Sequence, residues 1–296
     1  MSAEPRNALI VNPSSGAGRG RHLLPDAEEA MNAHGLAHRT IVTRSYEHGV
    51  EEARAAAEAG ETPVVMSGDG LIGAVGGALA NTGTAMGILP GGRGNDFARV
   101  LGIPGEVTEA VAVLASGTVR EVDVGEVNGK RFLCIASLGF DSDANRIANE
   151  TKWIRGNLVY AYAALRALAA WKPATFSLSL DGRHREVRGY AVAVANSKAY
   201  GGGMFVAPDA VLDDGLFDVV CTAGVSKLRF LTGLPKVFKG THVEKDEVSV
   251  ERAAEVRVEA DRPFAVYADG EHISDLPATM RVLPRALRVI APAAGS

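Results

Sequence analysis

The sequence predicts an α/β domain followed by a mostly antiparallel β domain. Over roughly the first 120 residues, apolar runs alternate with helical patterns, as expected of a parallel sheet covered by helices on both faces. Two of these runs, 64–66 and 86–89, each end in a glycine turn that opens a helical segment. Beyond residue 118, short apolar runs joined by hairpin turns such as Asn128-Gly129 and Asp181-Gly182 indicate antiparallel strands.

The elements expected in the first half are short and closely spaced. We expect strands at 8–11, 36–43, 64–66 and 86–89, and helices ending near 32 and covering 46–59, 71–79 and 106–116. This half is the predicted nucleotide-binding domain, residues 1–127. A closing strand at 286–290 is expected to return to it, so that 286–296 complete the domain.

The second half, residues 128–285, is the predicted β-sandwich. Its expected strands are 119–127 (leading in from the first domain), 131–137, 175–180, 187–196, 217–222, 247–250, 254–259, 264–267 and 278–283. Two helical patterns interrupt them, at 143–171 and 226–238. Pro235 is expected to break or kink the second helix.

Composition limits the classes of function. The 296 residues are 47% hydrophobic and 22% charged, which are globular values. A net charge of −4 argues against nucleic acid as a main partner. Cys134 and Cys221 lie in apolar runs and are expected to be reduced core residues. Without an apolar run long enough for a signal or a membrane span, we expect a cytoplasmic protein that can still meet a lipid surface.

Two glycine turns follow consecutive buried strands: Ser67-Gly68-Asp69-Gly70 and Pro90-Gly91-Gly92-Arg93-Gly94-Asn95-Asp96. Open α/β sheets bind ligands at the carboxyl ends of their strands, and glycines let main-chain N–H groups approach an anion closely. The carboxylates within the turns suit a divalent cation or a proton transfer. We therefore predict a phosphate site made by both turns. A third turn, at 12–20, is a weaker candidate because no Gly-Lys-Ser/Thr follows it.

Three turns of the second half carry candidate chemistry. The glycine triplet 201–203 either lies against a ligand or is a hairpin. The acidic turn at 208–216 either holds a hard cation or is a plain Asp-Gly turn. Asp269-Gly270-Glu271 offers two carboxylates as a general base, or is likewise only a turn.

Together these stretches resemble the bacterial diacylglycerol kinase and lipid kinase family, relatives of the sphingosine and ceramide kinases. The resemblance covers nearly the whole chain, in the family's order: Asn12-Pro13, Thr43, Ser67-Gly68-Asp69-Gly70, Pro90-Gly91-Gly92 with Gly94-Asn95-Asp96-Phe97-Ala98-Arg99, Gly139-Phe140-Asp141, Tyr200-Gly201-Gly202-Gly203-Met204, Pro208-Asp209-Ala210 with Asp213-Asp214-Gly215, and Asp269-Gly270-Glu271. It implies a first domain with the NAD kinase and phosphofructokinase fold, and a β-sandwich second domain. The implied activity is transfer of the γ-phosphoryl group of ATP to the hydroxyl of diacylglycerol or a related lipid.

The resemblance also implies the site residues. ATP would be bound by Asn12, Pro13, Ser14, Ser15, Gly16, Thr43, Ser67, Gly68, Asp69, Gly70, Leu71, Gly73, Gly92, Arg93, Asn95 and Asp96. The family's structural Mg²⁺ would be held by the Asp214 carboxylate and main-chain oxygens of Val211 and Leu216. Glu271 would take the proton from the lipid hydroxyl, with Asp269 as the second candidate, and Asp69 would orient the nucleotide or its Mg²⁺.

Three positions depart from the family's pattern. Leu71 stands where most bacterial members have Thr, Gly73-Ala74 replaces an Asn-Glu pair, and Arg93 replaces Thr or Ser. Arg93 could supply a phosphate contact instead, because its fork suits phosphate oxygens. These changes motivate one alternative, a catalytically impaired lipid- or nucleotide-binding regulator. The other alternative is an NAD or sugar kinase on the same first-domain fold.

Two helical segments raise the question of membrane contact. Residues 226–239 interleave apolar residues with four basic ones, which suits either an anionic membrane surface or core packing. Residues 157–171, flanked by Trp153 and Arg155, place Leu158, Tyr162, Leu165 and Leu168 at helical spacing, which favours a core-facing helix. The expected partner is a lipid at the membrane surface, and a homodimer is left open.

Overall fold

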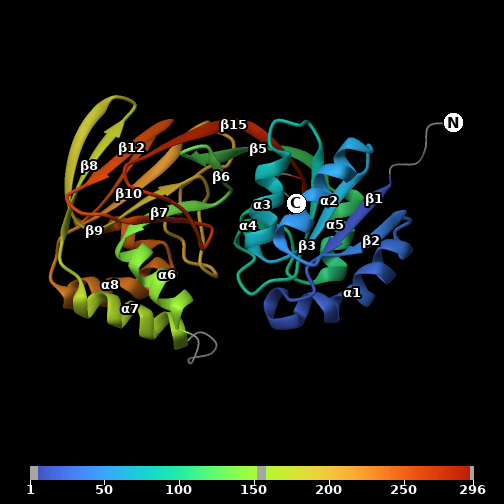
Figure 1. Cartoon of the computed structure of the whole chain (residues 1–296), viewed down its shortest axis with the longest axis horizontal. Helices are drawn as coiled ribbons and strands as arrows, with labels where there is room; N and C mark the ends of the chain where they lie inside the picture. The colour runs from blue at the N-terminus through green and yellow to red at the C-terminus, as the bar shows by residue number, and fades with distance from the viewer. Residues whose placement is uncertain (1–5, 152–157, 294–296) are drawn as a thin grey trace. The chain divides into compact units, whose positions relative to one another are not determined.

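The computed structural model describes residues 6–151 and 158–293 (Figure 1). The chain divides into two compact units. Unit 1 comprises Met1–Val124, Arg131–Leu133 and Leu283–Ser296, and unit 2 comprises Gly125–Lys130 and Cys134–Val282. Strands β5 (Thr118–Val127) and β15 (Ala278–Ala291) contribute residues to both units.

Unit 1 is an α/β domain with a parallel sheet, as predicted. Its remaining elements are β1 (Asn7–Val11), α1 (Ser15–Ala33), β2 (His38–Val42), α2 (Tyr46–Glu58), β3 (Thr62–Ser67), α3 (Asp69–Leu79), β4 (Ala85–Pro90), α4 (Asp96–Val100), α5 (Val107–Ser116) and β6 (Lys130–Phe132). The strands run parallel in the order β4-β3-β1-β2, and the end of β15 adds parallel to β4. Helix α1 packs with α5, and α2 packs with α3.

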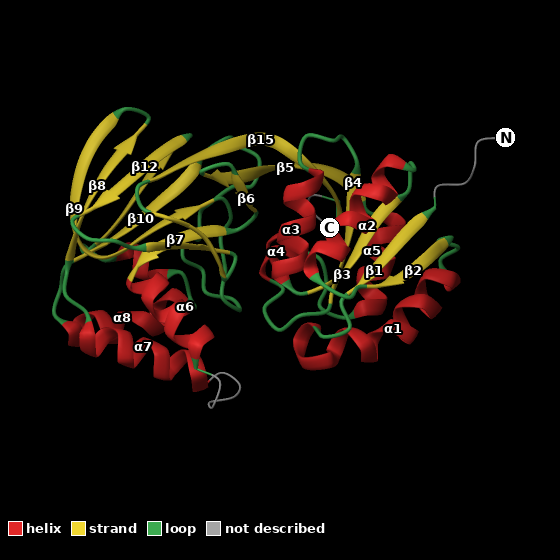
Figure 2. Cartoon of the chain, in the orientation of Figure 1, coloured by secondary structure: helices red, strands yellow, loops and turns green. Residues whose placement is uncertain are grey.

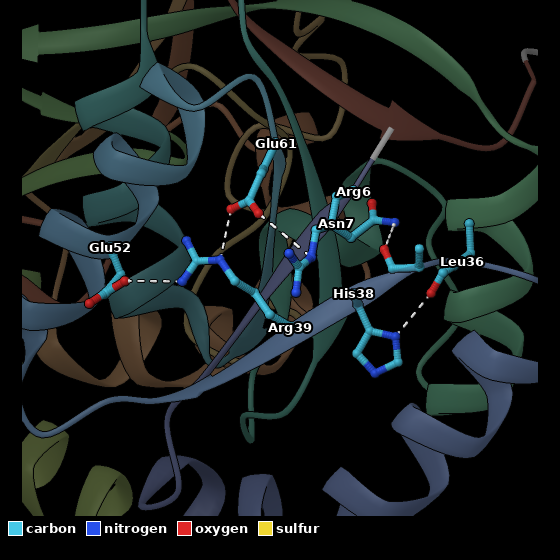
Figure 3. A network of polar contacts seen from close by, with 8 residues as sticks. Arg6, Asn7, Leu36, His38, Arg39, Glu52 and Glu61 are labelled. Atoms are coloured by element: carbon cyan, nitrogen blue, oxygen red, sulfur yellow. Dashed lines mark hydrogen bonds and ion pairs between the residues drawn. The ribbon is translucent and has the colours of Figure 1, made fainter. Parts of the chain in front are cut away.

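Burial follows position in this sheet. Every residue of β1 is buried, whereas the edge strand β2 is partly exposed. The edge is held by polar contacts (Figure 3). Arg39 on β2 donates from Nε to Oε2 of Glu61 over 2.8 Å and lies 3.6 Å from Oε2 of Glu52. Arg6 adds a longer contact of 3.9 Å to Glu61. These ion pairs hold the edge strand β2 in place, and the buried central strands form the core.

Unit 2 is the predicted antiparallel β domain with helices (Figure 2). Its remaining elements are β7 (Ile135–Gly139), α6 (Phe140–Glu150), α7 (Leu158–Ala170), β8 (Ala174–Leu180), β9 (Arg183–Ala195), β10 (Phe217–Ala223), α8 (Lys227–Val237), the short 3-10 helix η1 (Thr241–Glu244), β11 (Val248–Ala253), β12 (Glu255–Ala260), β13 (Ala265–Ala268) and β14 (Glu271–Asp275). Strand β9 pairs antiparallel with β7, β8 and β10, and β12 pairs antiparallel with β8 and β15.

Several expected boundaries were wrong. The single strand expected at 131–137 is two strands, β6 and β7, which fall in different units. The two strands expected at 278–283 and 286–290 are one continuous strand, β15. The helix expected at 143–171 is two helices, and Trp153, Arg155 and Asn157 lie outside the described residues. Pro235 does not break α8, which ends two residues later at Val237. Proline lacks a main-chain N–H, but so close to the end of the helix its absence affects only the last turn.

An aromatic cluster joins the helices of unit 2 to its sheet. Phe230 of α8 stacks on Tyr190 of β9, with ring centroids 4.1 Å apart, and Trp171 after α7 stacks on Tyr190 at 6.0 Å. The buried side of α7 includes Ala163, Ala167 and Leu168. Leu165, which was expected on that core face, is 55% exposed. The buried face of α7 is therefore narrower than its apolar spacing predicted.

Candidate functional site

Three turns of unit 1 lie at one edge of the sheet. They follow β1, β3 and β4, which are parallel, so their carboxyl ends meet at the same edge. The turn after β1 begins at Asn12, the turn after β3 is centred on Gly68, and the turn after β4 runs from Gly91 to Asn95. Most of the residues expected to bind ATP belong to these turns.

Direct contacts join the three turns. The Ser15 hydroxyl, in the first turn, donates to the carbonyl of Gly91 in the third over 2.9 Å. The main chains of the second and third turns touch, because a Cβ added to Gly92 would lie 2.4 Å from Cα of Gly68. The Phe97 main-chain N–H donates to Oδ1 of Asp69 over 3.2 Å. The structure thus assembles segments separated by up to about 80 residues into one surface of main chain.

The first turn belongs to this surface although its sequence signal was the weakest. Gly16, Ala17 and Gly18 all have positive φ, of 57°, 61° and 96°. A Cβ added to Gly16 would come within 2.8 Å of the Gly91 carbonyl oxygen. The turn is therefore shaped to pack on the turn after β4, and its departure from the P-loop pattern does not exclude it from an anion site.

Asp69 is the electrostatically unusual group of this surface. Burial, with added repulsion from Asp96, raises the pKa of Asp69 above its ordinary range, and hydrogen bonds from the main-chain N–H groups of Phe97, Asp96 and Asn95 oppose that rise. Asp96 is 4% exposed and binds Arg99 at 2.6 Å. Asp96 is therefore already neutralised by a side chain, whereas Asp69 accepts hydrogen bonds from main-chain amides.

The departures from the family's pattern have separate structural consequences. Leu71 is 1% exposed and packs beneath α2, where a Cβ added to Gly49 would be 2.8 Å from its Cδ1. Its side chain is therefore a core group, and only its main chain is available to a ligand. Gly73 is also buried. Arg93 is exposed and makes no hydrogen bond or ion pair with the described residues, so its guanidinium is free to meet an anion.

Of the remaining predicted contacts of unit 1, Thr43 and Ser67 are buried, whereas Asn12 and Asn95 are half-buried. Thr43 is 7% exposed and donates its main-chain N–H to the carbonyl of Val11, and Ser67 is 1% exposed. Asn95 shapes the third turn, because its side-chain Oδ1 accepts the N–H of Gly92 over 2.8 Å. Asn12 does the same in the first turn, accepting the N–H of Ser14 over 3.0 Å.

The acidic turn of unit 2 lies beside a positively charged side chain, Arg252 of β11. Asp214 accepts the N–H of Leu216 through Oδ1 over 3.0 Å, and its Oδ2 lies 3.5 Å from Nη1 of Arg252. The same guanidinium lies 3.3 Å from Asp218, which is buried, and beside a cavity of about 300 Å³ also lined by Asp209. Within the described ranges, no group of three or more His, Cys, Asp or Glu side chains is placed to hold a metal ion.

The two candidate bases have different surroundings. Asp269 has a φ of 51°, and its Oδ1 accepts the N–H groups of Cys134 and Ile135 over 2.9 and 3.2 Å. That oxygen therefore anchors the β13–β14 turn to the start of β7. Glu271 is the first residue of β14 and is exposed. Glu271 is the more accessible carboxylate of the pair.

The glycine triplet is a tight turn. Gly201, Gly202 and Gly203 all have positive φ, of 66°, 85° and 101°, which L side chains rarely adopt. Tyr200 and Met204 close the turn with two main-chain hydrogen bonds of 3.1 and 3.0 Å. Backbone conformation alone accounts for all three glycines, which favours the hairpin interpretation over the ligand one.

Sequence reasoning missed two residues beside these turns. Tyr46, at the start of α2, covers Gly70 so closely that an added Cβ would be 2.2 Å from its hydroxyl. No sequence pattern pointed to it. Arg252 was missed as well, although pairing 217–222 with 248–253 would have placed it opposite Asp218. Cross-strand register was therefore the unused signal.

Comparison with known proteins identifies the family. The diacylglycerol kinase catalytic domain matches residues 6–127, and the YegS C-terminal NAD kinase beta sandwich-like domain matches residues 134–291. A diacylglycerol kinase of Mycobacterium tuberculosis is 37% identical, over 97% of this chain and 95% of that protein. One from Bacillus subtilis is 28% identical over 97% and 96%.

Solved structures show the same fold. A diacylglycerol kinase from Bacillus anthracis superposes with a TM-score of 0.76 at 21% identity, over the whole of both chains. The α/β unit, the β-sandwich unit and both domain matches agree with one another. The chain therefore belongs to the bacterial diacylglycerol kinase and lipid kinase family, and it is a lipid kinase.

Proposed function

We propose that the protein transfers the γ-phosphoryl group of ATP to a free hydroxyl of diacylglycerol or a related lipid. The observation that carries the proposal is the contact among the three turns after β1, β3 and β4. Phosphoryl transfer depends on positioning and on neutralising charge more than on covalent chemistry. A surface of main-chain N–H groups at the ends of parallel strands supports that role.

The residues of unit 1 would divide the binding of the nucleotide. Main-chain amides of the three turns would receive the phosphates, because glycine leaves them accessible. Arg93, exposed and without an acidic partner among the residues described, would add a mobile positive charge. Asp69 would orient the nucleotide or its Mg²⁺.

Mg²⁺ fits the chemistry of the acidic turn, with Arg252 as a competitor. The Asp214 carboxylate and the main-chain oxygens of Val211 and Leu216 are oxygen donors, which hard divalent cations prefer. Asp214 Oδ2 is also 3.5 Å from the Arg252 guanidinium. When bound, Mg²⁺ would supply positive charge that stabilises the turn. Arg252 and Mg²⁺ would thus compete for the carboxylate of Asp214.

Glu271 is the proposed base. A lipid hydroxyl is a poor nucleophile, so a carboxylate within hydrogen-bond reach must accept its proton. Glu271 is exposed, whereas one oxygen of Asp269 accepts the main-chain N–H groups of Cys134 and Ile135. Glu271→Gln is expected to lower kcat by at least about a hundredfold without unfolding the protein. Glu186→Gln on β9, also exposed, is the matched control.

Transfer of labelled phosphate from ATP to lipids tests the proposal. The substrates are diacylglycerol, phosphatidylglycerol, ceramide and sphingosine, with NAD and sugars as competing acceptors. Lipid that is labelled by the wild-type protein but not by Glu271→Gln supports a lipid kinase. Label on NAD or a sugar would support the alternative kinase, and ATP binding without transfer would support the impaired regulator suggested by Leu71, Gly73-Ala74 and Arg93.

A further inference from the structure

Helix α8 is fixed to unit 2 through one side. Phe230, which is 9% exposed, stacks on Tyr190 and meets Phe140 edge to face, with ring centroids 4.8 Å apart. Ser226 caps the helix by accepting the N–H of Arg229. In Figure 1, α8 lies beside α7 on the helical side of unit 2. The side of α8 that carries Phe230 is therefore anchored to the unit, and α8 also packs against η1.

The outward surface of α8 carries an apolar stripe. We define the stripe as Leu228, Leu231, Pro235 and Phe238. Their spacings of three, four and three residues place them on one face of a helix. Leu228 is 72% exposed, Leu231 36% and Phe238 55%. Single exposed apolar residues are common on protein surfaces, but a row of this length on one helical face marks a contact surface.

Two of the basic residues on α8 attach the helix to its own unit. Arg229 binds both carboxylate oxygens of Glu247, over 3.0 and 2.7 Å. Lys227 donates from Nζ to the carbonyl of Ala169, in the last turn of α7, over 2.7 Å. These cations have internal partners and hold the position of the stripe.

The other basic residues lack such partners. Lys236 and Lys239 have no carboxylate at ion-pair distance in the described part of the chain, and residues 226–239 contain no acidic residue at all. A side-chain hydrogen bond with Lys245, then burial and repulsion from Lys245, lower the pKa of Lys236, and the carboxylates of Glu247 and Glu244 oppose that change from beyond ion-pair distance. A protein of net charge −4 thus gathers positive charge beside its apolar stripe.

This combination fits a bilayer better than a protein partner. An interfacial helix inserts apolar side chains among the acyl chains, while flanking lysines meet anionic headgroups. No helix among the described residues is long and apolar enough to cross a membrane. We propose that α8 is the membrane-docking element, with the stripe inserted in an anionic bilayer and Lys236 and Lys239 at its phosphates. The inference rests on the proposed function, because a lipid kinase must reach a substrate held in a bilayer.

Vesicle sedimentation tests the docking. The full chain is mixed with phosphatidylcholine vesicles with or without about one third phosphatidylglycerol. We expect Lys236→Gln with Lys239→Gln to weaken binding to anionic vesicles about 25-fold at low salt, at roughly fivefold per lysine. Leu228→Gln with Phe238→Gln should weaken binding at low and high salt alike, because insertion is not screened.

Matched controls remove similar groups elsewhere. Arg54→Gln with Lys130→Gln deletes two exposed positive charges, and Val42→Gln replaces a side chain that is 50% exposed. These variants should bind vesicles as the wild type does. Equal binding by the α8 variants and the controls would overturn the proposal. A second outcome would also overturn it: Leu228→Gln with Phe238→Gln abolishes dimerisation, measured by sedimentation velocity, while vesicle binding persists. The stripe would then be a contact surface for a second copy of the chain.

Kinase assays separate this inference from the proposed function. Short-chain diacylglycerol dispersed in detergent needs no bilayer docking, so the α8 variants should phosphorylate it normally but lose activity on vesicle-embedded substrate. If neither the wild type nor any variant phosphorylates dispersed lipid, the proposed function is wrong, even if vesicle binding still depends on α8. Equal loss on both substrates would contradict a docking role.

Discussion

The main-chain N–H of Phe97 donates to Oδ1 of Asp69 over 3.2 Å, so the carboxylate expected to orient the nucleotide also links two turns of unit 1. Asp69 follows β3, and Phe97 lies in α4 after β4. The same side chain thus serves the architecture of the site and its proposed chemistry. Substitutions that keep or remove the acceptor oxygen separate these two roles.

Asp69→Asn should keep the fold and lose the activity. Asparagine retains an oxygen for Phe97 and removes a charge that burial and Asp96 disfavour, so the variant should melt at or above the wild-type temperature. Asp69→Ala leaves the Phe97 N–H without that acceptor and should be less stable than Asp69→Asn by about 1 kcal/mol. Denaturant unfolding and phosphate transfer measure the two effects. Full activity in Asp69→Asn would contradict a role for the negative charge.

Gly92→Ala should disrupt the contact between the turns. Its Cβ would lie 2.4 Å from Cα of Gly68 and 2.9 Å from Oδ1 of Asn95, so the two turns must separate. We expect a stability loss of about 1–3 kcal/mol and a weaker rise in melting temperature on adding ATP. Gly105→Ala is the control, because an added Cβ there meets nothing within 4 Å. If Gly92→Ala behaves like Gly105→Ala, the contact is not needed.

Arg252→Gln should make the acidic turn depend on divalent cations. The substitution leaves Asp214 and the buried Asp218 without their shared guanidinium. Because Arg252 is half-exposed and water screens the pair, we expect a loss of about 1–2 kcal/mol rather than the larger cost of a fully buried pair. Millimolar Mg²⁺ should then raise the melting temperature of the variant more than that of the wild type.

The matched control for this test is Arg257→Gln, which breaks an exposed pair with Glu259. It should shift stability by less than about 0.5 kcal/mol and show no added response to Mg²⁺. Scanning fluorimetry with Mg²⁺ and with a chelator measures the melting temperature of each variant and its response to the metal. Identical Mg²⁺ responses in wild type and Arg252→Gln would show that Arg252 and the metal do not compete.

His242 should contribute a pH-dependent loss of stability. It is 8% exposed, its Nε2–H donates to the main-chain carbonyl of Val206 over 3.1 Å, and burial lowers its pKa below the ordinary 6.5. As pH falls below about 6.5, the unfolded chain takes up a proton that the folded chain resists, so protonation favours unfolding. Unfolding free energies at pH 7.5 and 5.5 should differ less in His242→Gln than in the wild type. A difference of equal size in both proteins would exclude this histidine as the cause.

Local pattern was sufficient for much of the architecture. The run 64–66 and the glycine turn behind it predicted β3 and the start of α3, because a buried strand must stop where glycine and aspartate end its hydrophobic pattern. Asn128-Gly129 and Asp181-Gly182 predicted hairpins, and the structure gives all four residues positive φ. The family motifs, in order along the chain, predicted the lipid kinase family that the domain matches show.

Other features depended on partners far along the chain. Nothing local separates a single strand at 131–137 from two strands in different units, or shows that 278–291 is continuous. The role of Asp269 as an anchor for β7 and the approach of Arg252 to Asp214 both need the register of paired strands. Leu71 could be read as a lost nucleotide contact until packing placed its side chain in the core.

Local sequence was enough to indicate which strands lead into glycine turns, where the main chain bends through glycine and which carboxylates are available, because those properties belong to short segments. The folded molecule was needed to show which carboxylates are already occupied, which turns touch and which face of α8 is exposed. The physical reason is that hydrogen bonds and burial depend on groups brought together by folding, and their sequence separations, such as 135 residues between Cys134 and Asp269, leave no local trace.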